Sequence, residues 1–303
     1  MNANLPPKTP ANATPGSHRT NPATNKGVPI KDWLDSATNQ LVFAQSPSAR
    51  LDAELILAHT VRKSRTWLHG HGDDTLDERS IEIANARLDL RLDHVPVAYI
   101  VGHKEFYGHT FKVTTATLIP RPESEVLLDL LHHALPRNQS LLQSEPLHLV
   151  DVGTGSGNLG ISAKLLFPEL DVTLLDTSRH ALAVAEENAR QLHAAVTVLK
   201  SDLLSAYPFQ ADIIIANLPY VDPSWKRSPE TDHEPTSALF ARNHGLALII
   251  ALLAQTKHTL RRGGKLILEA DPRQHAALQK EAARSGFVLV EQDGFGLLFD
   301  KLT

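Results

Sequence analysis

The sequence predicts an open, mostly parallel α/β sheet preceded by a small helical domain. From Leu147 onward, short apolar segments alternate with longer segments of helical periodicity, a pattern typical of a parallel sheet with helices on both faces. Before residue 93, apolar residues recur at helical spacing instead. With 303 residues, 42% of them hydrophobic, the chain is long enough to form more than one domain.

The first 28 residues are predicted to form a disordered tail. They are rich in Pro, Asn, Thr and Ala and hold few large apolar side chains, so little burial would offset the entropy lost on ordering. Residues 29–93 are predicted to form a helical domain, with Trp33, Leu34 and Leu41 on one apolar face. This domain is interpreted as a substrate-recognition module, and a purely structural cap is the alternative.

Residues 94–117 are predicted to form a β-hairpin linker, because the segment 94–113 is rich in β-branched and aromatic residues and glycines. Beyond it, Pro122, Glu123 and Glu125 suit the start of an apolar helix over residues 126–135. Solvated surface charge is the other interpretation of the two glutamates. The remaining residues, 118–303, are predicted to form the sheet domain.

Seven strands are expected in this domain, at 147–151, 172–176, 196–199, 212–216, 265–269, 287–291 and 296–301. Only residues 292–295 separate the last two strands, which is too short for a crossover helix. These two strands are therefore predicted to be antiparallel, which gives a mostly parallel sheet with one reversed strand at its edge.

Composition excludes several classes of protein. A net charge of −4 disfavours an extended nucleic-acid-binding surface. The absence of cysteine excludes disulfides, thiolate metal sites and cysteine nucleophiles. No apolar run approaches the roughly 20 residues of a membrane helix, and the 16 histidines show no metal-ligand spacing. We therefore expect a cytoplasmic monomer without a metal, although a secreted protein without disulfides would have the same composition.

A glycine-rich turn follows the first strand of the sheet, in the sequence DVGTGSG at residues 151–157. Glycines allow a sharp turn and a close approach to a ligand, and the N–H groups of the next helix favour an anion or a lone pair. Asp176 ends the second strand, where it could accept both hydroxyls of a ribose, and Asp202 could accept from an adenine amino group. The three positions together predict a nucleoside cofactor.

The glycine pattern alone leaves two other interpretations open. Gly155, Gly157 and Gly160 also satisfy GxGxxG, and Asp176 lies at about the distance expected for dinucleotide binding, so a nicotinamide dehydrogenase is an alternative. Asp176 could also be an ordinary exposed acid at a strand end.

The sequence Asn-Leu-Pro-Tyr at 217–220 follows the fourth strand and distinguishes these alternatives. The Asn217 side-chain oxygen and the Leu218 carbonyl can together accept both hydrogens of a planar –NH2 group, while Pro219 stiffens the turn and Tyr220 can stack on the group. Amide and exocyclic amine nitrogens are poor nucleophiles, so orientation and hydrogen bonding must assist their methylation. The turn therefore favours methyl transfer to such a nitrogen, with a purely structural turn as the alternative.

Together these features resemble the S-adenosylmethionine-dependent glutamine-amide methyltransferases that modify peptide-chain release factors. The resemblance covers roughly residues 30–300. It rests on the order and spacing of the segments PVAYIVG (96–102), EFYG (105–108), PRPESE (120–125), the glycine turn, Asn-Leu-Pro-Tyr, and HEP (233–235) with Ala238-Leu239. It implies a Rossmann-like class I methyltransferase sheet, S-adenosylmethionine as cofactor, and a Gly-Gly-Gln glutamine as substrate.

The resemblance also implies the site residues. The catalytic residues would be Asn217, Pro219 and Tyr220. The substrate would be bound by Asn217, Leu218, Pro219, Tyr220 and Glu123. The cofactor would be bound by Arg121, Asp151, Gly153, Thr154, Gly155, Gly157, Asp176, Thr177, Asp202, Leu203 and Asn217. No residue is an obvious base, so the amide proton would pass to water after direct in-line transfer.

The sequence departs from the family pattern in places. Leu218 replaces a proline of the usual Asn-Pro-Pro-Tyr, and the tetrapeptide found here is also used by adenine methyltransferases. The alternative functions are therefore a glutamine methyltransferase for a large-subunit ribosomal protein, a nucleic-acid adenine methyltransferase, and a cofactor-binding interaction protein without activity. The release factor is the expected partner, with no membrane association and no stable nucleic-acid binding.

Overall fold

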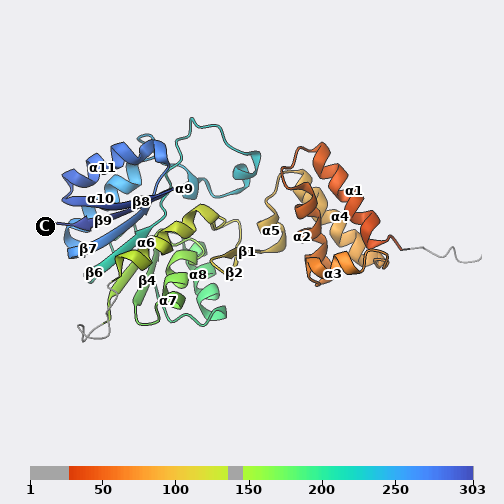
Figure 1. Ribbon diagram of the computed structural model, residues 1–303, viewed down its shortest axis with the longest axis horizontal. Coiled ribbons are helices and arrows are strands. Elements are labelled where there is room, and N and C mark those ends of the chain that lie inside the picture. Colours follow the sequence, from red (N-terminus) through yellow and green to blue (C-terminus); the bar gives the residue numbers. More distant parts are fainter. Residues whose placement is uncertain (1–26, 136–145, 303) are drawn as a thin grey trace, which may run out of the picture.

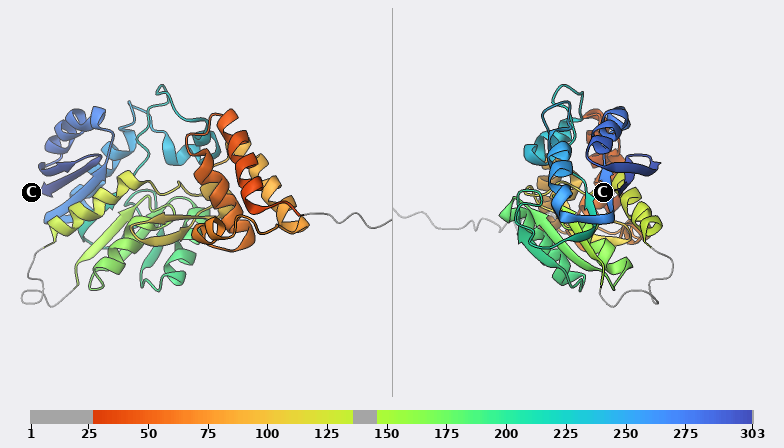
Figure 2. Two further views of the ribbon diagram at one scale, coloured as in Figure 1. Left: turned by 45° about the vertical axis from the view of Figure 1, so that its right-hand side comes forward. Right: turned by 90° about the vertical axis from the view of Figure 1, so that its left-hand side faces the viewer.

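The computed structural model describes residues 27–135 and 146–302. A helical domain lies beside a larger α/β domain, and a short helix and a two-stranded hairpin connect them (Figures 1 and 2). The predicted disordered tail lies outside the described residues up to residue 26. Val28, at its end, is held in place, because its carbonyl accepts a hydrogen bond from the Leu76 N–H at 2.9 Å.

The N-terminal domain contains α1 (Ile30–Phe43), α2 (Ala49–Val61), α3 (Arg65–Gly70) and α4 (Glu78–Leu92). The side chains of Ser64 and Asp77 accept backbone N–H groups at the starts of α3 and α4 and so satisfy donors that the helices leave free. The predicted apolar face is buried, with Trp33, Leu34 and Leu41 each at most 5% exposed. This domain therefore has a hydrophobic core of its own.

The linker differs in part from the prediction. Only β1 (His103–Phe106) and β2 (His109–Lys112) form the hairpin, whereas Val97–Val101 form a short helix, α5. Pro96 precedes this helix at φ −56°, as its ring requires, and Gly102 ends it in the left-handed region at φ +79°. These flanking residues favour one helical turn over the strand that the β-branched composition predicted.

The second domain contains a seven-stranded sheet of order β5-β4-β3-β6-β7-β9-β8. Its strands are β3 (His148–Val152), β4 (Asp171–Asp176), β5 (Thr197–Lys200), β6 (Ala211–Ala216), β7 (Leu260–Glu269), β8 (Phe287–Asp293) and β9 (Gly296–Lys301). Strands β3 to β7 are parallel, and β9 is antiparallel to both of its neighbours. The predicted fold class is confirmed, although β7 begins at Leu260 rather than at 265.

The position of the reversed strand is a correction. It is the last strand, as predicted, but it lies between β7 and β8 instead of at the edge. Leu297, Leu298 and Phe299 on β9 are almost fully buried, as expected of a strand inside a sheet, whereas Val288 and Val290 on β8 are exposed. The more apolar strand therefore occupies the inner position.

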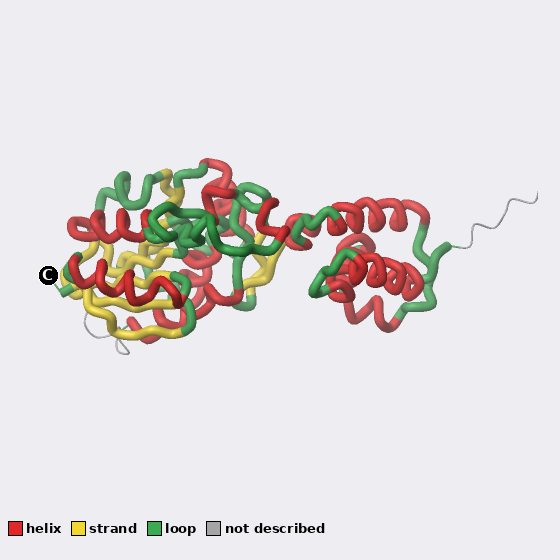
Figure 3. The backbone as a smooth tube through the Cα atoms, turned by 90° about the horizontal axis from the view of Figure 1, so that it is seen from above, coloured by secondary structure: helices red, strands yellow, loops and turns green. Residues whose placement is uncertain are grey.

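Helices cover both faces of this sheet (Figure 3). On one face α6 (Val126–Ala134), α7 (Asn158–Leu166) and α8 (Arg179–Gln191) pack over the strands, and on the other α10 (Ala247–Thr259) and α11 (His275–Arg284) do so. The short helix α9 (Thr236–Leu239) comes after β6 in the chain, between β6 and α10. Within the part of the chain that the structure describes, none of the helices has the length and apolar character needed to cross a membrane.

The strand order predicts a ligand site at the carboxyl ends of the central strands. Strand β3 has β4 on one side and β6 on the other, and the chain reaches these neighbours in opposite directions across the sheet. Ligands of open α/β sheets bind where the order reverses, outside the carboxyl ends of the strands. Here that point is the gap beyond β3 and β6, where Val152 and Ala216 are paired.

Candidate active site

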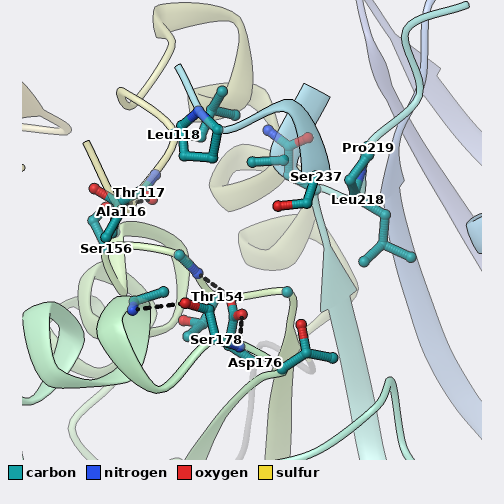
Figure 4. A pocket seen from close by; sticks show the side chains of 18 of the residues that line it. Ala116, Thr117, Leu118, Thr154, Ser156, Asp176, Ser178, Leu218, Pro219 and Ser237 are labelled. Carbon is teal, nitrogen blue, oxygen red and sulfur yellow. Dashed lines mark hydrogen bonds between the residues drawn. The ribbon is translucent and has the colours of Figure 1, made fainter. Parts of the chain in front are cut away.

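A cavity of about 340 Å³ opens at the carboxyl ends of β3, β4 and β6 (Figure 4). It brings together segments from 116–124, the glycine turn, the end of β4, the start of the loop after β5, and the turn after β6. The predicted site residues that line it are Arg121, Gly153, Thr154, Gly155, Asp176, Thr177, Asp202, Leu203, Asn217, Leu218 and Pro219. The predicted residues Glu123, Asp151, Gly157 and Tyr220 are not among the lining residues.

The glycine turn is shaped by close contacts. Gly153 has φ +75°, and a Cβ added there would lie 2.8 Å from Leu218 Cδ2, so the turn after β6 packs directly against it. Gly155 has φ +55°, and its N–H donates to Asp176 Oδ2 at 2.9 Å. Gly157, at φ +83°, occupies the N-cap position of α7. Glycine adopts these left-handed backbone conformations with less strain than any other residue.

Asp151 braces the turn from behind. It is buried, and its Oδ2 accepts hydrogen bonds from the Thr154 hydroxyl at 2.6 Å and the Gly160 N–H at 2.9 Å. Its Oδ1 is buried without a hydrogen-bond partner. Burial raises the pKa of Asp151 to about 6. Asp151 therefore holds the loop in position and does not line the cavity, which differs from the direct cofactor contact expected of it.

Asp176 lies at the rim in a position suited to bind hydroxyl groups. Besides the Gly155 N–H, it accepts the Ser178 N–H through Oδ1 at 2.8 Å. Each carboxylate oxygen has two lone pairs, so each retains one acceptor position after these bonds are made. Asp202 is exposed and lines the same cavity. A ligand that carries hydroxyl and amino donors, such as a nucleoside, matches these two carboxylates.

The turn after β6 presents a fixed carboxamide. Asn217 Nδ2 donates to the Ser124 hydroxyl at 2.9 Å, which leaves Oδ1 as the side-chain atom available to accept from a ligand. Leu218 is only 4% exposed because its side chain packs in the core beside Gly153. The Leu218 side chain thus fills the space between the turn and the glycine loop. Pro219 lines the cavity next to them.

The Tyr220 hydroxyl points to the buried Glu269 and not into the cavity. Its hydroxyl donates to Glu269 Oε1 at 2.9 Å, and burial together with the charge of Glu269 raises the pKa of Tyr220 well above its usual range. Glu269 is itself buried, and burial, with a smaller effect from the charge of Glu123, raises its pKa. The Tyr220 carbonyl accepts from Gln274 Nε2 at 2.8 Å. Tyr220 therefore anchors the turn, and its ring is half-buried.

Several buried polar residues at the site were missed by the sequence prediction. Ser124 orients Asn217, and Glu269 holds Tyr220. Glu234 pairs with Arg121 and accepts the Ile119 N–H at 3.2 Å, so it fixes the cavity wall. Asn188 donates to the Ser156 carbonyl at 2.8 Å. Glu234 lies in the segment His-Glu-Pro and Ser124 in the segment PRPESE, so these two segments were the available sequence signals.

The segment that follows the turn also contacts the N-terminal domain. Arg91 of α4 is buried and pairs with Asp52 at 2.7 Å and with Glu230, which lies in the 3-10 helix η3 (Pro229–His233). His233 Nε2 lies 3.0 Å from the Asp93 carbonyl. These contacts connect the helical domain to the segment directly after the candidate catalytic turn.

Comparison with known proteins decides between the alternatives. Residues 32–102 match the family described as PrmC N-terminal domain, and residues 124–233 match the family described as Methyltransferase small domain. The release factor glutamine methyltransferase of Escherichia coli (strain K12) is 33% identical over 261 residues, which span 85% of this chain and 89% of that protein. The chain belongs to the release factor glutamine methyltransferase family. The predicted resemblance is therefore confirmed.

A second relative agrees with this membership. The family member of Koribacter versatilis is 36% identical over 253 residues, which cover 80% of this chain and 88% of that protein. Among solved structures, a methyltransferase from Pyrococcus furiosus has 17% sequence identity and a TM-score of 0.49, covering 72% of this chain and 98% of that chain. Membership in the family makes this chain an S-adenosylmethionine-dependent methyltransferase and not a dehydrogenase.

Proposed function

We propose that this protein methylates the side-chain amide nitrogen of the glutamine in the Gly-Gly-Gln motif of peptide-chain release factors, with S-adenosylmethionine as methyl donor. The observation that carries the proposal is that the turn at 217–219 and the glycine turn at 153–155 line one cavity. A nucleoside and a planar amide can therefore be held next to each other. The names of the relatives support the identity of the protein substrate.

The residues of the cavity suit the cofactor. When bound, S-adenosylmethionine supplies an electrophilic methyl group on a sulfonium. We assign the ribose hydroxyls to Asp176 and the adenine amino group to Asp202, both of which line the cavity. Gly153 and Gly155 have no side chains, so the cofactor can approach their backbone closely. The Asp151 carboxylate holds their loop in place through its hydrogen bonds with Thr154 and Gly160.

Asn217 and Leu218 would orient the substrate amide. Asn217 Oδ1 and the Leu218 carbonyl would accept its two hydrogens, which fixes the plane of the group and increases the electron density on nitrogen. The hydrogen bond from Asn217 Nδ2 to Ser124 keeps the acceptor oxygen available for this purpose. The proton lost from the amide would pass to water.

The two domains would have different roles, one in substrate recognition and the other in methyl transfer. We propose that residues 29–93 recognise the release factor, that residues 94–117 are the linker, and that residues 118–303 bind the cofactor and catalyse transfer. The contacts of Arg91 with Glu230 and of His233 with Asp93 support this division, because they join the recognition domain to the segment beside the catalytic turn. We further propose that the protein acts as a cytoplasmic monomer, without stable binding to nucleic acid.

The function is tested with labelled S-adenosylmethionine and purified release factor. The label should be transferred to wild-type release factor and not to a variant in which Gly-Gly-Gln is changed to Gly-Gly-Ala. Large-subunit ribosomal proteins and a DNA substrate serve as parallel acceptors for the alternative activities. Label on both release factors alike, or only on a ribosomal protein or DNA, would contradict the proposed substrate.

A further inference from the structure

A second cavity, of about 620 Å³, lies in the N-terminal domain and extends to the start of the hairpin. Its charged and titratable lining consists entirely of basic residues from α2, the turn after it, α4 and β1. They are His59, Arg62, Lys63, Arg87 and His103. None of the residues that line this cavity is Asp or Glu. In a chain of net charge −4, this is a local concentration of positive charge.

These basic groups are not neutralised by acidic neighbours. Within residues 27–135 and 146–302, the ion pairs include none with Arg62, Lys63 or Arg87. Arg87 donates instead to the Thr60 hydroxyl at 2.8 Å. By contrast, Arg50 and Arg65 nearby on the same domain both pair with Glu54. Lys63 Nζ lies 5.4 Å from the centroid of the Trp67 ring, so its contact in this domain is with an aromatic ring and not with a carboxylate.

The basic groups lie close enough together to repel one another at His59. Its ring centroid lies 5.8 Å from that of His103. Burial lowers the pKa of His59, and the positive charges of Arg87 and His103 lower it further. An anionic ligand would relieve this repulsion, so binding of an anion is favoured by the arrangement itself.

The remainder of the lining is apolar. Leu55, Ala58, Ile83 and Val101 lie among the basic groups, and Ile83 is 37% exposed. A nucleic-acid backbone is mostly charged and polar, so it covers such side chains poorly. A peptide segment in which acidic residues alternate with apolar ones matches both parts of the surface.

We propose that this cavity binds an acidic, partly apolar segment of the protein substrate, outside the segment that carries the methylated glutamine. This rests on the proposed function, which makes the release factor that substrate. Through Arg91 and Glu230, α4 contacts the segment that leads to Pro235, and Pro235 lines the active-site cavity. A single protein can therefore contact both surfaces, and the basic cavity adds affinity and a faster encounter without taking part in methyl transfer.

The test variant is Arg62→Gln together with Lys63→Gln, because both side chains are exposed and glutamine removes their charge while remaining polar. The matched control is Arg79→Gln together with Lys280→Gln, two exposed basic residues outside the cavity, which change net charge equally. At low salt, the cavity variant should raise KM for release factor about tenfold with kcat nearly unchanged, while the control stays near wild type. High salt should reduce the difference.

Equal KM values for the cavity variant and the control would overturn the proposal. Loss of binding to a single-stranded RNA by the cavity variant, with KM for release factor unchanged, would also overturn it and would assign the cavity to nucleic acid. If the wild-type protein transfers no methyl to release factor, the proposed function fails. Equilibrium binding of fluorescent release factor to the same variants then tests the cavity separately, and equal affinities would overturn it.

Discussion

Ser124 has a predicted role that follows from a single hydrogen bond. It is 1% exposed, and its hydroxyl accepts from Asn217 Nδ2 at 2.9 Å. In Ser124→Ala this acceptor is lost, and the Asn217 amide can rotate so that its NH2 group faces the substrate amide. In that orientation two donors oppose each other, so the substrate nitrogen is no longer held for transfer.

The expected size of the effect comes from the energy of one hydrogen bond. A neutral side-chain hydrogen bond contributes about 0.5–1.5 kcal/mol net. Since about 1.4 kcal/mol corresponds to a tenfold rate change, kcat should fall roughly twofold to tenfold. The affinity for S-adenosylmethionine should change little, because the substituted hydroxyl acts through Asn217 on the substrate amide.

The assay is steady-state methyl transfer to release factor, with cofactor affinity measured by isothermal titration calorimetry. Ser162→Ala is the matched control, because Ser162 is also fully buried and its hydroxyl has no hydrogen-bond partner. Thermal unfolding of both variants accounts for changes in stability. If kcat of Ser124→Ala equals that of Ser162→Ala, the orientation argument is refuted.

Three further predictions concern the cofactor side of the cavity. Asp176→Asn removes the charge that accepts the Gly155 N–H, and should weaken S-adenosylmethionine binding about 10- to 100-fold in calorimetry; unchanged affinity would contradict the assignment. Gly153→Ala should lower the free energy of unfolding in urea by about 1–2 kcal/mol because of its left-handed backbone, whereas Gly70→Ala, where a Cβ meets open space, should not; equal losses would contradict this. The pKa of Asp151, raised to about 6, favours the folded state at low pH, and this stabilisation is lost as pH rises from 4 to above 6. The stability of Asp151→Asn relative to wild type should therefore increase over that range by about 3 kcal/mol; a difference constant with pH would show that Asp151 does not titrate this way.

Much of the fold was predictable because its signals are local. The alternation of apolar strands and helices specified the sheet, and the glycine turn and Asn-Leu-Pro-Tyr marked the strand ends that meet at the cavity. Residues 97–101 were misread because their β-branched composition was weighed above the flanking Pro96 and Gly102. The inner position of β9 was missed because spacing determines that two strands are antiparallel but not which of them pairs with β7.

The parts of the site that could not be predicted depend on contacts between distant residues. Ser124 and Asn217 are 93 residues apart, and Arg121 and Glu234 are 113 apart. No periodicity links such positions, and a buried polar residue has the same appearance in a sequence as an exposed one. The bracing contacts of Asp151 and Tyr220 were not predicted for the same reason, since their partners Gly160 and Glu269 emerge only in the folded chain.

The most direct test of the central claim is a structure of the protein with S-adenosylhomocysteine and a peptide that contains Gly-Gly-Gln. The account predicts the glutamine amide nitrogen within about 3 Å of Asn217 Oδ1 and of the Leu218 carbonyl, with the nucleoside against Asp176. A glutamine bound elsewhere, or a turn at 217–220 that makes no contact with it, would contradict the account.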